Sequence, residues 1–385
     1  KEQKSDSYSF LWVGNNKSIN SNLLDNKVYP FRSFSGRVNI DVVLLEFNLS
    51  KAYPTKSDKD VYTEFFVTFD KEIISDPLWL KNHLNNGFDI AFQDSDDYLN
   101  YLSNKGSLNW KKRLSGEIVG DIKQVDIYKN GRQQMVFRTE EHLYLLDRNG
   151  NELEQLSFPI NSSLLNNPIS IFDYEKNRNY RFLITEDNLI KMYDSNGKIV
   201  SGFKPPLFDS NIINSPVHIR IDGKDYIVLQ LENGGLKILD RRGRDRVILD
   251  DKILYSDNPI FSYLENFTTS DRLGNLIKID TNGNLTEENL NLSSENLIDI
   301  VDNNLVYLNE NRLTIKGITV DLPFSKFSKP KIFIDSKVML VGITDFNEEK
   351  IYLYKDNGEL VKGFPIKGNS VIDIKDSDND GKIEI

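Results

Sequence analysis

One pattern recurs seven times along the chain and restricts its fold more than any other feature. In each copy, a segment of alternating apolar residues runs into a turn that ends in glycine, and the glycines lie 34 to 47 residues apart. The seven segments span residues 98–106, 143–150, 189–197, 236–243, 276–283, 311–317 and 351–358. A period of about 40 residues with several strands per repeat is typical of a β-propeller, since helical repeats of that length would show a 3.6-residue period.

The turns themselves predict hairpins. Asn-Gly occurs at 149–150, 196–197, 282–283 and 357–358. This dipeptide favours a type I′ turn, in which both central residues have positive φ. We therefore expect the third and fourth strands of each unit to meet at these turns.

A second pair of strands is expected upstream of each hairpin. Clear examples are 122–128 with 134–139, 169–174 with 180–185, and 217–221 with 226–231. Two pairs give four strands per unit, the number in a propeller blade. The fifth and sixth units are shorter, with 297–307 and 331–343 supplying their inner strands. The sequence thus predicts an all-β protein with seven blades in residues 86–385, and eight blades as the alternative.

Closure of the ring matters because an open propeller would expose a sheet edge. Residues 370–385 begin another unit, and the first hairpin has only 88–93 before it. The simplest prediction is that C-terminal strands complete the first blade. An incomplete eighth blade is the alternative.

Residues 1–85 fall outside the repeat. Segments 37–48 and 61–69 alternate like strands, and 75–84 is compatible with a short helix. We interpret this part as a small, mainly β domain or as the remnant of a larger one.

Composition excludes several classes of function. The net charge of −10 argues against nucleic-acid binding through a basic surface. The absence of cysteine excludes disulfides, thiolate metal sites and cysteine nucleophiles. No apolar stretch approaches the roughly 20 residues of a membrane-spanning helix, and no leader opens the sequence, so a targeting segment or anchor, if there is one, lies upstream of Lys1.

Four runs carry a resemblance to a protein family. They are 120–131 (GDIKQVDIYKNG), 166–180 (NNPISIFDYEKNRNY), 220–231 (RIDGKDYIVLQL) and 363–380 (GFPIKGNSVIDIKDSDND). The propeller region resembles uncharacterised Bacteroidota cell-envelope proteins in which a domain of unknown function precedes a degenerate WD40-like or quinoprotein-like propeller. Residues 1–85 resemble the preceding domain only in fragments such as 34–45. The resemblance implies an envelope location, in the periplasm or at the outer membrane, and carries over no catalytic residue.

The sharpest local chemistry lies near the C-terminus, in a turn with carboxylates at its first, third and fifth positions and glycine at its sixth. Asp376, Asp378 and Asp380, with Glu384, have the spacing of a calcium loop, and any such ion would be structural. The alternative interpretation is an ordinary acidic turn held by Asx hydrogen bonds. The corresponding turns at 126–131 and 173–177 keep only part of the acidic set, which favours the bare turn.

Other polar residues give weaker signals. His83, His142 and His218 are scattered, and each is interpreted as a strand or edge residue. The basic cluster at 241–246 is interpreted as a solvated turn whose arginines pair with nearby aspartates. The pairs Gly202-Phe203 and Gly363-Phe364 are expected to pack between adjacent blades. Quinone-dependent dehydrogenases have similar repeats but use a cysteine pair, which this chain lacks.

Two classes of function follow. The first is a non-enzymatic scaffold, such as a lipoprotein subunit of an outer-membrane assembly or secretion complex, whose partners are other envelope or outer-membrane proteins. The second is a glycan-binding or glycan-processing module with a site in the central channel. Because no blade carries a reactive constellation, the sequence favours the scaffold, with no catalytic residue and no cofactor apart from the calcium just considered.

Overall fold

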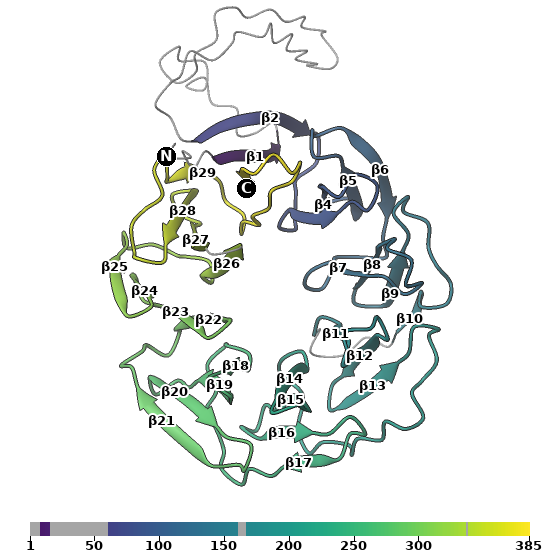
Figure 1. Cartoon of the computed structure of the whole chain (residues 1–385), viewed down its shortest axis with the longest axis vertical. Coiled ribbons are helices and arrows are strands. Elements are labelled where there is room, and N and C mark those ends of the chain that lie inside the picture. The colour runs from purple at the N-terminus through teal and green to yellow at the C-terminus, as the bar shows by residue number, and fades with distance from the viewer. Residues whose placement is uncertain (1–7, 16–60, 161–166, 336–337) are drawn as a thin grey trace, which may run out of the picture.

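The computed structural model describes residues 8–15, 61–160, 167–335 and 338–385. In these parts every regular element is a β-strand. Seven small sheets surround a central axis (Figure 1), so the protein is an all-β, seven-bladed β-propeller, as the repeat predicts. None of the described residues belongs to a helix long and apolar enough to cross a membrane.

Each blade is one continuous stretch of chain folded as an antiparallel meander. Blade 1 consists of β3 (Leu78–Lys81), β4 (Phe88–Gln93), β5 (Tyr98–Leu102) and β6 (Leu108–Arg113). Blade 2 consists of β7 (Lys123–Val125), β8 (Gln134–Arg138), β9 (His142–Leu146) and β10 (Phe158–Pro159). Blade 3 consists of β11 (Ser170–Phe172), β12 (Arg181–Glu186) and β13 (Leu189–Tyr193). Blades 4 and 5 consist of β14 (Val217–Ile221), β15 (Lys224–Gln230), β16 (Leu236–Leu239) and β17 (Asp245–Val247), and of β18 (Phe261–Tyr263), β19 (Asn266–Ser270), β20 (Asn275–Ile279) and β21 (Leu285–Asn289). Blades 6 and 7 consist of β22 (Leu297–Val301), β23 (Asn304–Asn309), β24 (Arg312–Ile315) and β25 (Ile318–Asp321), and of β26 (Lys331–Asp335), β27 (Val338–Asp345), β28 (Lys350–Lys355) and β29 (Ile366–Lys367).

A further three-stranded sheet lies between blade 7 and blade 1 (Figure 1). We call it the closing sheet. Its central strand β1 (Tyr8–Asn15) pairs in parallel with β2 (Val61–Phe69) on one side and with the C-terminal β30 (Ile383–Glu384) on the other. The ring is therefore closed by strands from both ends of the described chain.

The predicted mode of closure is wrong. Blade 1 does not need C-terminal strands, because β3 supplies its inner strand and pairs with β4. This strand lies in segment 75–84, for which the sequence suggested a short helix. The propeller therefore begins before residue 86, the start predicted from the sequence. Segment 61–69 is a strand as predicted, whereas 37–48 lies outside the described residues.

The third-to-fourth-strand hairpins occur where predicted, but at the four Asn-Gly sites the turn type differs from the prediction, because only the glycine has positive φ. In the turn at 147–150, the Gly150 N–H donates to Asp147 O, and only the glycine has positive φ. The Asp147 carboxylate accepts the N–H groups of Asn149 and Asn151. An aspartate that opens the turn in this way favours a type I turn followed by a left-handed glycine over type I′.

These glycines also touch the preceding blade. At Gly197, with φ of 71°, a Cβ atom would lie 1.7 Å from Gln155 O in the loop between β9 and β10 of blade 2. Positive φ and close backbone approach thus require glycine at the same position. The turns space adjacent blades as well as reversing the chain.

The hydrophobic core lies between blades rather than within one. Phe172 and Leu183 of blade 3 pack with Ile227 and Leu239 of blade 4, and Phe203 of the connecting Gly-Phe pair lies in the same cluster. Burial of each such side chain stabilises the fold by roughly 1.5–3 kcal/mol. The prediction of packing between adjacent blades is confirmed for Phe203, whereas the buried Phe364 packs between blade 7 and the C-terminal residues Ile372, Ile374 and Ile385.

Candidate functional site

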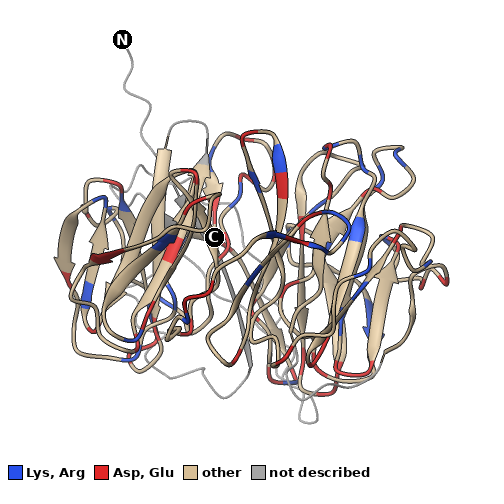
Figure 2. Ribbon diagram, turned by 90° about the horizontal axis from the view of Figure 1, so that it is seen from below, with Lys and Arg blue, Asp and Glu red and all other residues tan. Residues whose placement is uncertain are grey.

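The two faces of the ring differ in the turns that they carry. Along an antiparallel blade, the turn between the second and third strands and the connection to the next blade emerge at one edge, which we call the loop face. The two other turns of each blade emerge at the opposite edge, the hairpin face. Figure 2 views the ring from its side and shows acidic and basic segments interspersed over both faces.

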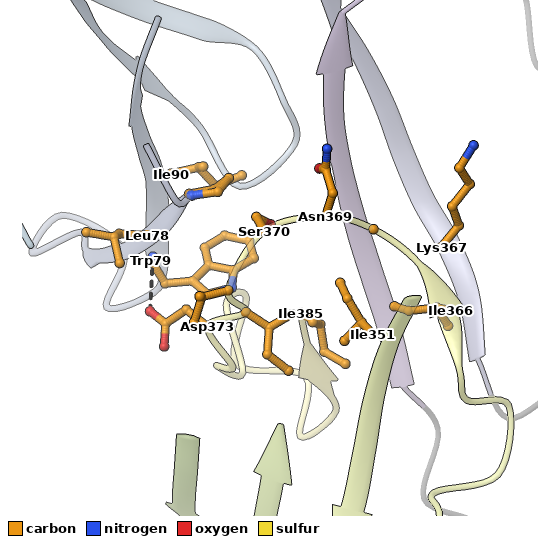
Figure 3. Close-up of a pocket in the computed structure, with 14 residues that line it drawn as sticks. Leu78, Trp79, Ile90, Ile351, Ile366, Lys367, Asn369, Ser370, Asp373 and Ile385 are labelled. Atoms are coloured by element: carbon orange, nitrogen blue, oxygen red, sulfur yellow. Dashed lines mark hydrogen bonds between the residues drawn. The ribbon is translucent and has the colours of Figure 1, made fainter. Parts of the chain in front are cut away.

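The ring closes through residues 369–385, which run from blade 7 to blade 1. The Val371 N–H donates to Asp76 Oδ1 at 2.8 Å, and the Trp79 N–H donates to Asp373 Oδ2 at 3.2 Å (Figure 3). On the hairpin face, the Phe88 N–H donates to Ser377 O at 2.9 Å. The C-terminal segment is thus bound to the inner edge of blade 1 along its length.

A small hollow remains at this junction (Figure 3). Its volume is 50 Å³, and its walls include Trp79, Ile90, Ile351 and Ile385. A space of this size holds little more than water. We interpret it as a packing defect of the closing junction.

A larger hollow of 370 Å³ shares Pro77, Leu78, Asn369 and Ser370 with the small one and extends toward blade 2. Among the described residues that line it, only Asp76 and Asp121 are charged. The walls limit hydration of Asp76, although solvent reaches it, and this raises the pKa of its carboxyl. The hydrogen bond from Val371 opposes the rise, and the charge of Asp121 adds to it.

The acidic turn at 376–381 brings together three of the four predicted calcium ligands. One carboxylate oxygen each from Asp376, Asp378 and Glu384 lies within 4.8 Å of the others. Asp380 instead pairs with Lys382 at 2.5 Å, and this contact lowers the pKa of the Asp380 carboxyl. Calcium binding stays a prediction.

Hydrogen bonds hold the same turn. Asp376 Oδ2 accepts the Gly381 N–H at 3.0 Å, and the buried Glu384 accepts the Ser377 N–H. The other oxygen, Asp376 Oδ1, is buried and has no hydrogen-bond partner among the described residues.

Two corresponding turns are built alike but neutralised differently. Asp126 accepts the N–H groups of Asn130 and Gly131, and Arg178 of the next blade donates to it at 2.7 Å. In the following turn, Glu175 pairs with Arg241 of blade 4. In each of these two turns, a carboxylate thus pairs with an arginine of the blade that follows it.

The three histidines are not brought together. His83 lies in the first turn of blade 1, His142 in β9 and His218 in β14. His218 contacts Asp225 at 2.7 Å and stacks edge-on against Tyr174, and His142 contacts Glu152. Burial and nearby arginines lower the pKa of His83.

The arginine-rich turn at 241–246 is largely paired. Arg244 pairs with Asp240, as predicted. Arg241 instead reaches blade 3, where it lies 4.5 Å from the Tyr174 ring centroid and pairs with Glu175, and it also pairs with Asp225. These contacts tie two blades together.

One set of junction residues was not predicted from the sequence. Each second strand has a polar residue at its last or second-to-last position, and the set is Gln93, Arg138, Thr185, Gln230, Ser270, Asn309 and Thr344. We call this the latch position. Five of the seven donate a side-chain hydrogen bond to the next inter-blade connection, with acceptors Gly116 O, Asn167 O, Asn258 O, Asn296 Oδ1 and Ser370 O. The sequence signal that could have identified the latch position is a polar residue that recurs near the end of each apolar second strand.

Lysines near the axis are used in the same way. Lys123 Nζ donates to Ile169 O at 2.8 Å, and Lys331 Nζ donates to Ile372 O at 3.1 Å. Burial lowers the pKa of Lys123. These cations bind the backbone of the next structural unit.

Large apolar side chains are exposed on the loop face. They lie in connections between blades or in second-to-third-strand turns, and they are Ile74, Leu207, Leu254, Leu273, Phe324 and Phe346. Phe324 is 94% exposed. Leu254 and Leu273 lie in adjacent loops, since Arg272 N–H donates to Leu254 O.

The comparisons with known proteins agree with the fold and do not assign the chain to a family. No family model and no curated protein matches the chain. The computationally designed protein Ika8 matches with a TM-score of 0.55 and 13% identity, over 81% of this chain and 95% of that chain. At this identity the likeness shows the fold alone.

Two further solved structures match at lower scores. BamB from Moraxella catarrhalis has a TM-score of 0.46 and 12% identity, over 70% of this chain and 77% of its own. BBS1N, in its complex with ARL6DN, has a TM-score of 0.48 and 11% identity, over 75% of this chain and 91% of its own. At these scores neither match supports an inference about function.

Proposed function

We propose that the protein is a non-enzymatic scaffold that docks other proteins through its loop face. The observation that carries the proposal is the set of exposed apolar side chains there, with Phe324 at 94% and Leu273 at 70% exposure. Neighbouring exposed apolar side chains mark protein-interaction surfaces, and the loops of Leu254 and Leu273 lie side by side.

The use of polar groups inside the ring supports the same proposal. Latch residues such as Arg138 and Gln230, and lysines such as Lys123, are engaged with backbone carbonyls of the next unit. Side chains that hold blades together contribute rigidity, which lowers the entropic cost of docking. We further propose a location in the bacterial cell envelope, within an assembly or secretion complex of Bacteroidota; this part rests on the sequence resemblance alone.

The test is capture of partners from native membranes with two matched variants. Phe324→Asp with Leu273→Asp places charge on the loop face, and Leu84→Asp, at 69% exposure, does so on the hairpin face. We expect the first variant to lose most of the captured partner and the second to keep it, with both unfolding as the wild type does. Equal capture by both variants, or recovery of the wild type alone, would contradict the proposal. Fractionation of the native cells tests the envelope location separately.

A further inference from the structure

The 370 Å³ hollow beside the closing junction combines aliphatic side chains with polar groups, among them two carboxylates. Ile73, Ile118, Ile122 and Leu78 contribute aliphatic surface. A volume of this order accommodates one long side chain or a small ligand. The wall favours an occupant with a methylene stem.

The charge of the hollow is negative. Asp76 and Asp121 are the charged residues in the described part of its wall, and Asp121 lies near enough to raise the pKa of Asp76. Among the described residues, the Asp76 carboxylate accepts one hydrogen bond, from the Val371 N–H. The hollow therefore has acceptor capacity for a cationic donor.

The cations nearby are already engaged. Lys331 acts on Asp76 electrostatically, but its ammonium group donates to Ile372 O and lies 3.7 Å from Asp373 Oδ1. Lys123 interacts with Asp121, yet donates to Ile169 O. A cation bound inside the hollow would add an electrostatic attraction to the carboxylates of Asp76 and Asp121 that these two lysines do not supply.

The hollow is continuous with the proposed docking surface. Ile74 lines the hollow and belongs to the exposed apolar set of the loop face. A partner seated on those side chains would present its own residues to the hollow. This continuity favours a side chain carried by a partner over a free small molecule.

We infer that the hollow binds a lysine side chain of the partner protein, with the ammonium group between Asp76 and Asp121 and the methylene stem against the isoleucines. The inference rests on the proposed function, because it assigns one contact of the docked partner. A lysine fits this wall because its long apolar stem ends in a compact charge.

The experiment is an NMR titration of the full chain with Nα-acetyl-lysine methylamide. Cadaverine is the free-amine probe, and Nα-acetyl-norleucine methylamide is the uncharged control. The variant is Asp76→Asn with Asp121→Asn, which keeps the acceptor for Val371. The matched control is Asp257→Asn, in an equivalent loop with a side chain 87% exposed.

We expect the lysine amide to bind on the order of millimolar and the norleucine amide not to bind. The double variant should weaken binding by about tenfold, and Asp257→Asn should not change it. The double variant should also lose partner capture while unfolding as the wild type does.

Three results would overturn the inference: no binding by the wild type, equal binding by the double variant, or a marked preference for cadaverine. None of them would disturb the Phe324 and Leu273 result, so failure of this inference is distinguishable from failure of the scaffold proposal.

Discussion

Two kinds of junction hold the ring together. At the six junctions between consecutive blades, the partners are joined by a short connection, packed through shared clusters and tied by residues such as Gln93 and Arg138. At the closing junction, residues 369–385 meet blade 1 and β1 across almost the full length of the chain. The contacts are similar in kind, but the closing ones must form without a local tether and so cost more loop-closure entropy.

The acidic turns show the same contrast. Asp126 and Glu175 receive arginines from the next blade, because a next blade follows them in sequence. In the turn at 376–381, Asp380 pairs with Lys382 of the same turn, and the carboxylates of Asp376, Asp378 and Glu384 face one another. The difference shows that equivalent turns of the repeat can balance their acidic groups either with an arginine of the next blade or within the turn itself.

The largest effect is expected at an ordinary junction. Gly197→Ala should lower the free energy of unfolding by about 3 kcal/mol, because its Cβ would clash with Gln155 O in addition to the cost of positive φ. Gly131→Ala has a similar φ, 82°, and open space, so it should cost only about 1 kcal/mol. Urea denaturation measures both values. Equal losses would mean that the turn does not contact the preceding blade.

Closure can be compared directly through two isoleucines at the same repeat position. Ile169 and Ile372 lie four residues before Asp173 and Asp376, and both are buried. Replacing either with alanine should lower the free energy of unfolding by about 3 kcal/mol if the ring unfolds as one unit. Hydrogen exchange on the same samples follows residues 371–385. Rapid exchange there, with global stability unchanged in Ile372→Ala, would show that closure opens independently.

The sequence predicts the features that are set by residues close together in the chain, and not the contacts between distant segments. The strand 61–69, the hairpin at 311–317 and the burial of Phe203 follow from patterns within one unit. The turn type was wrong because Asp147, two residues before Asn149, sets it. Pairing of β1 with β30 and the meeting of Asp76 with Asp121 join distant segments, and no local period encodes such contacts.

The arginine supplied to an acidic turn gives a smaller effect. Arg178→Met leaves the buried Asp126 carboxylate without its cation and should cost about 1–2 kcal/mol. Arg272→Met removes a partner 3.8 Å from the exposed Asp257 and should cost under about 0.5 kcal/mol. Thermal unfolding of both variants measures the difference. Equal costs would remove the proposed role of the inter-blade arginine.

The smallest effect is expected from calcium. Because no arginine in the described part of the chain pairs with the turn at 376–381, calcium should stabilise the protein relative to a chelator-treated sample by about 1 kcal/mol. Asp378→Asn should abolish the difference, and Asp302→Asn, in an exposed turn of blade 6 on the same face, should retain it. Superimposed unfolding curves of the wild type with and without calcium would leave the bare turn as the correct interpretation.

Closure by strands from the two ends of the described chain is most directly tested by cross-linking. The protein has no cysteine, so Tyr8→Cys with Ile383→Cys introduces a single pair at positions that face each other in the register of β1 and β30. Neighbouring strands bring Cα atoms within disulfide range. We predict rapid, complete intramolecular oxidation of this pair and none for Tyr8→Cys with Leu264→Cys in blade 5. Failure of the first pair to oxidise in the folded protein would contradict a ring closed by β1 and β30.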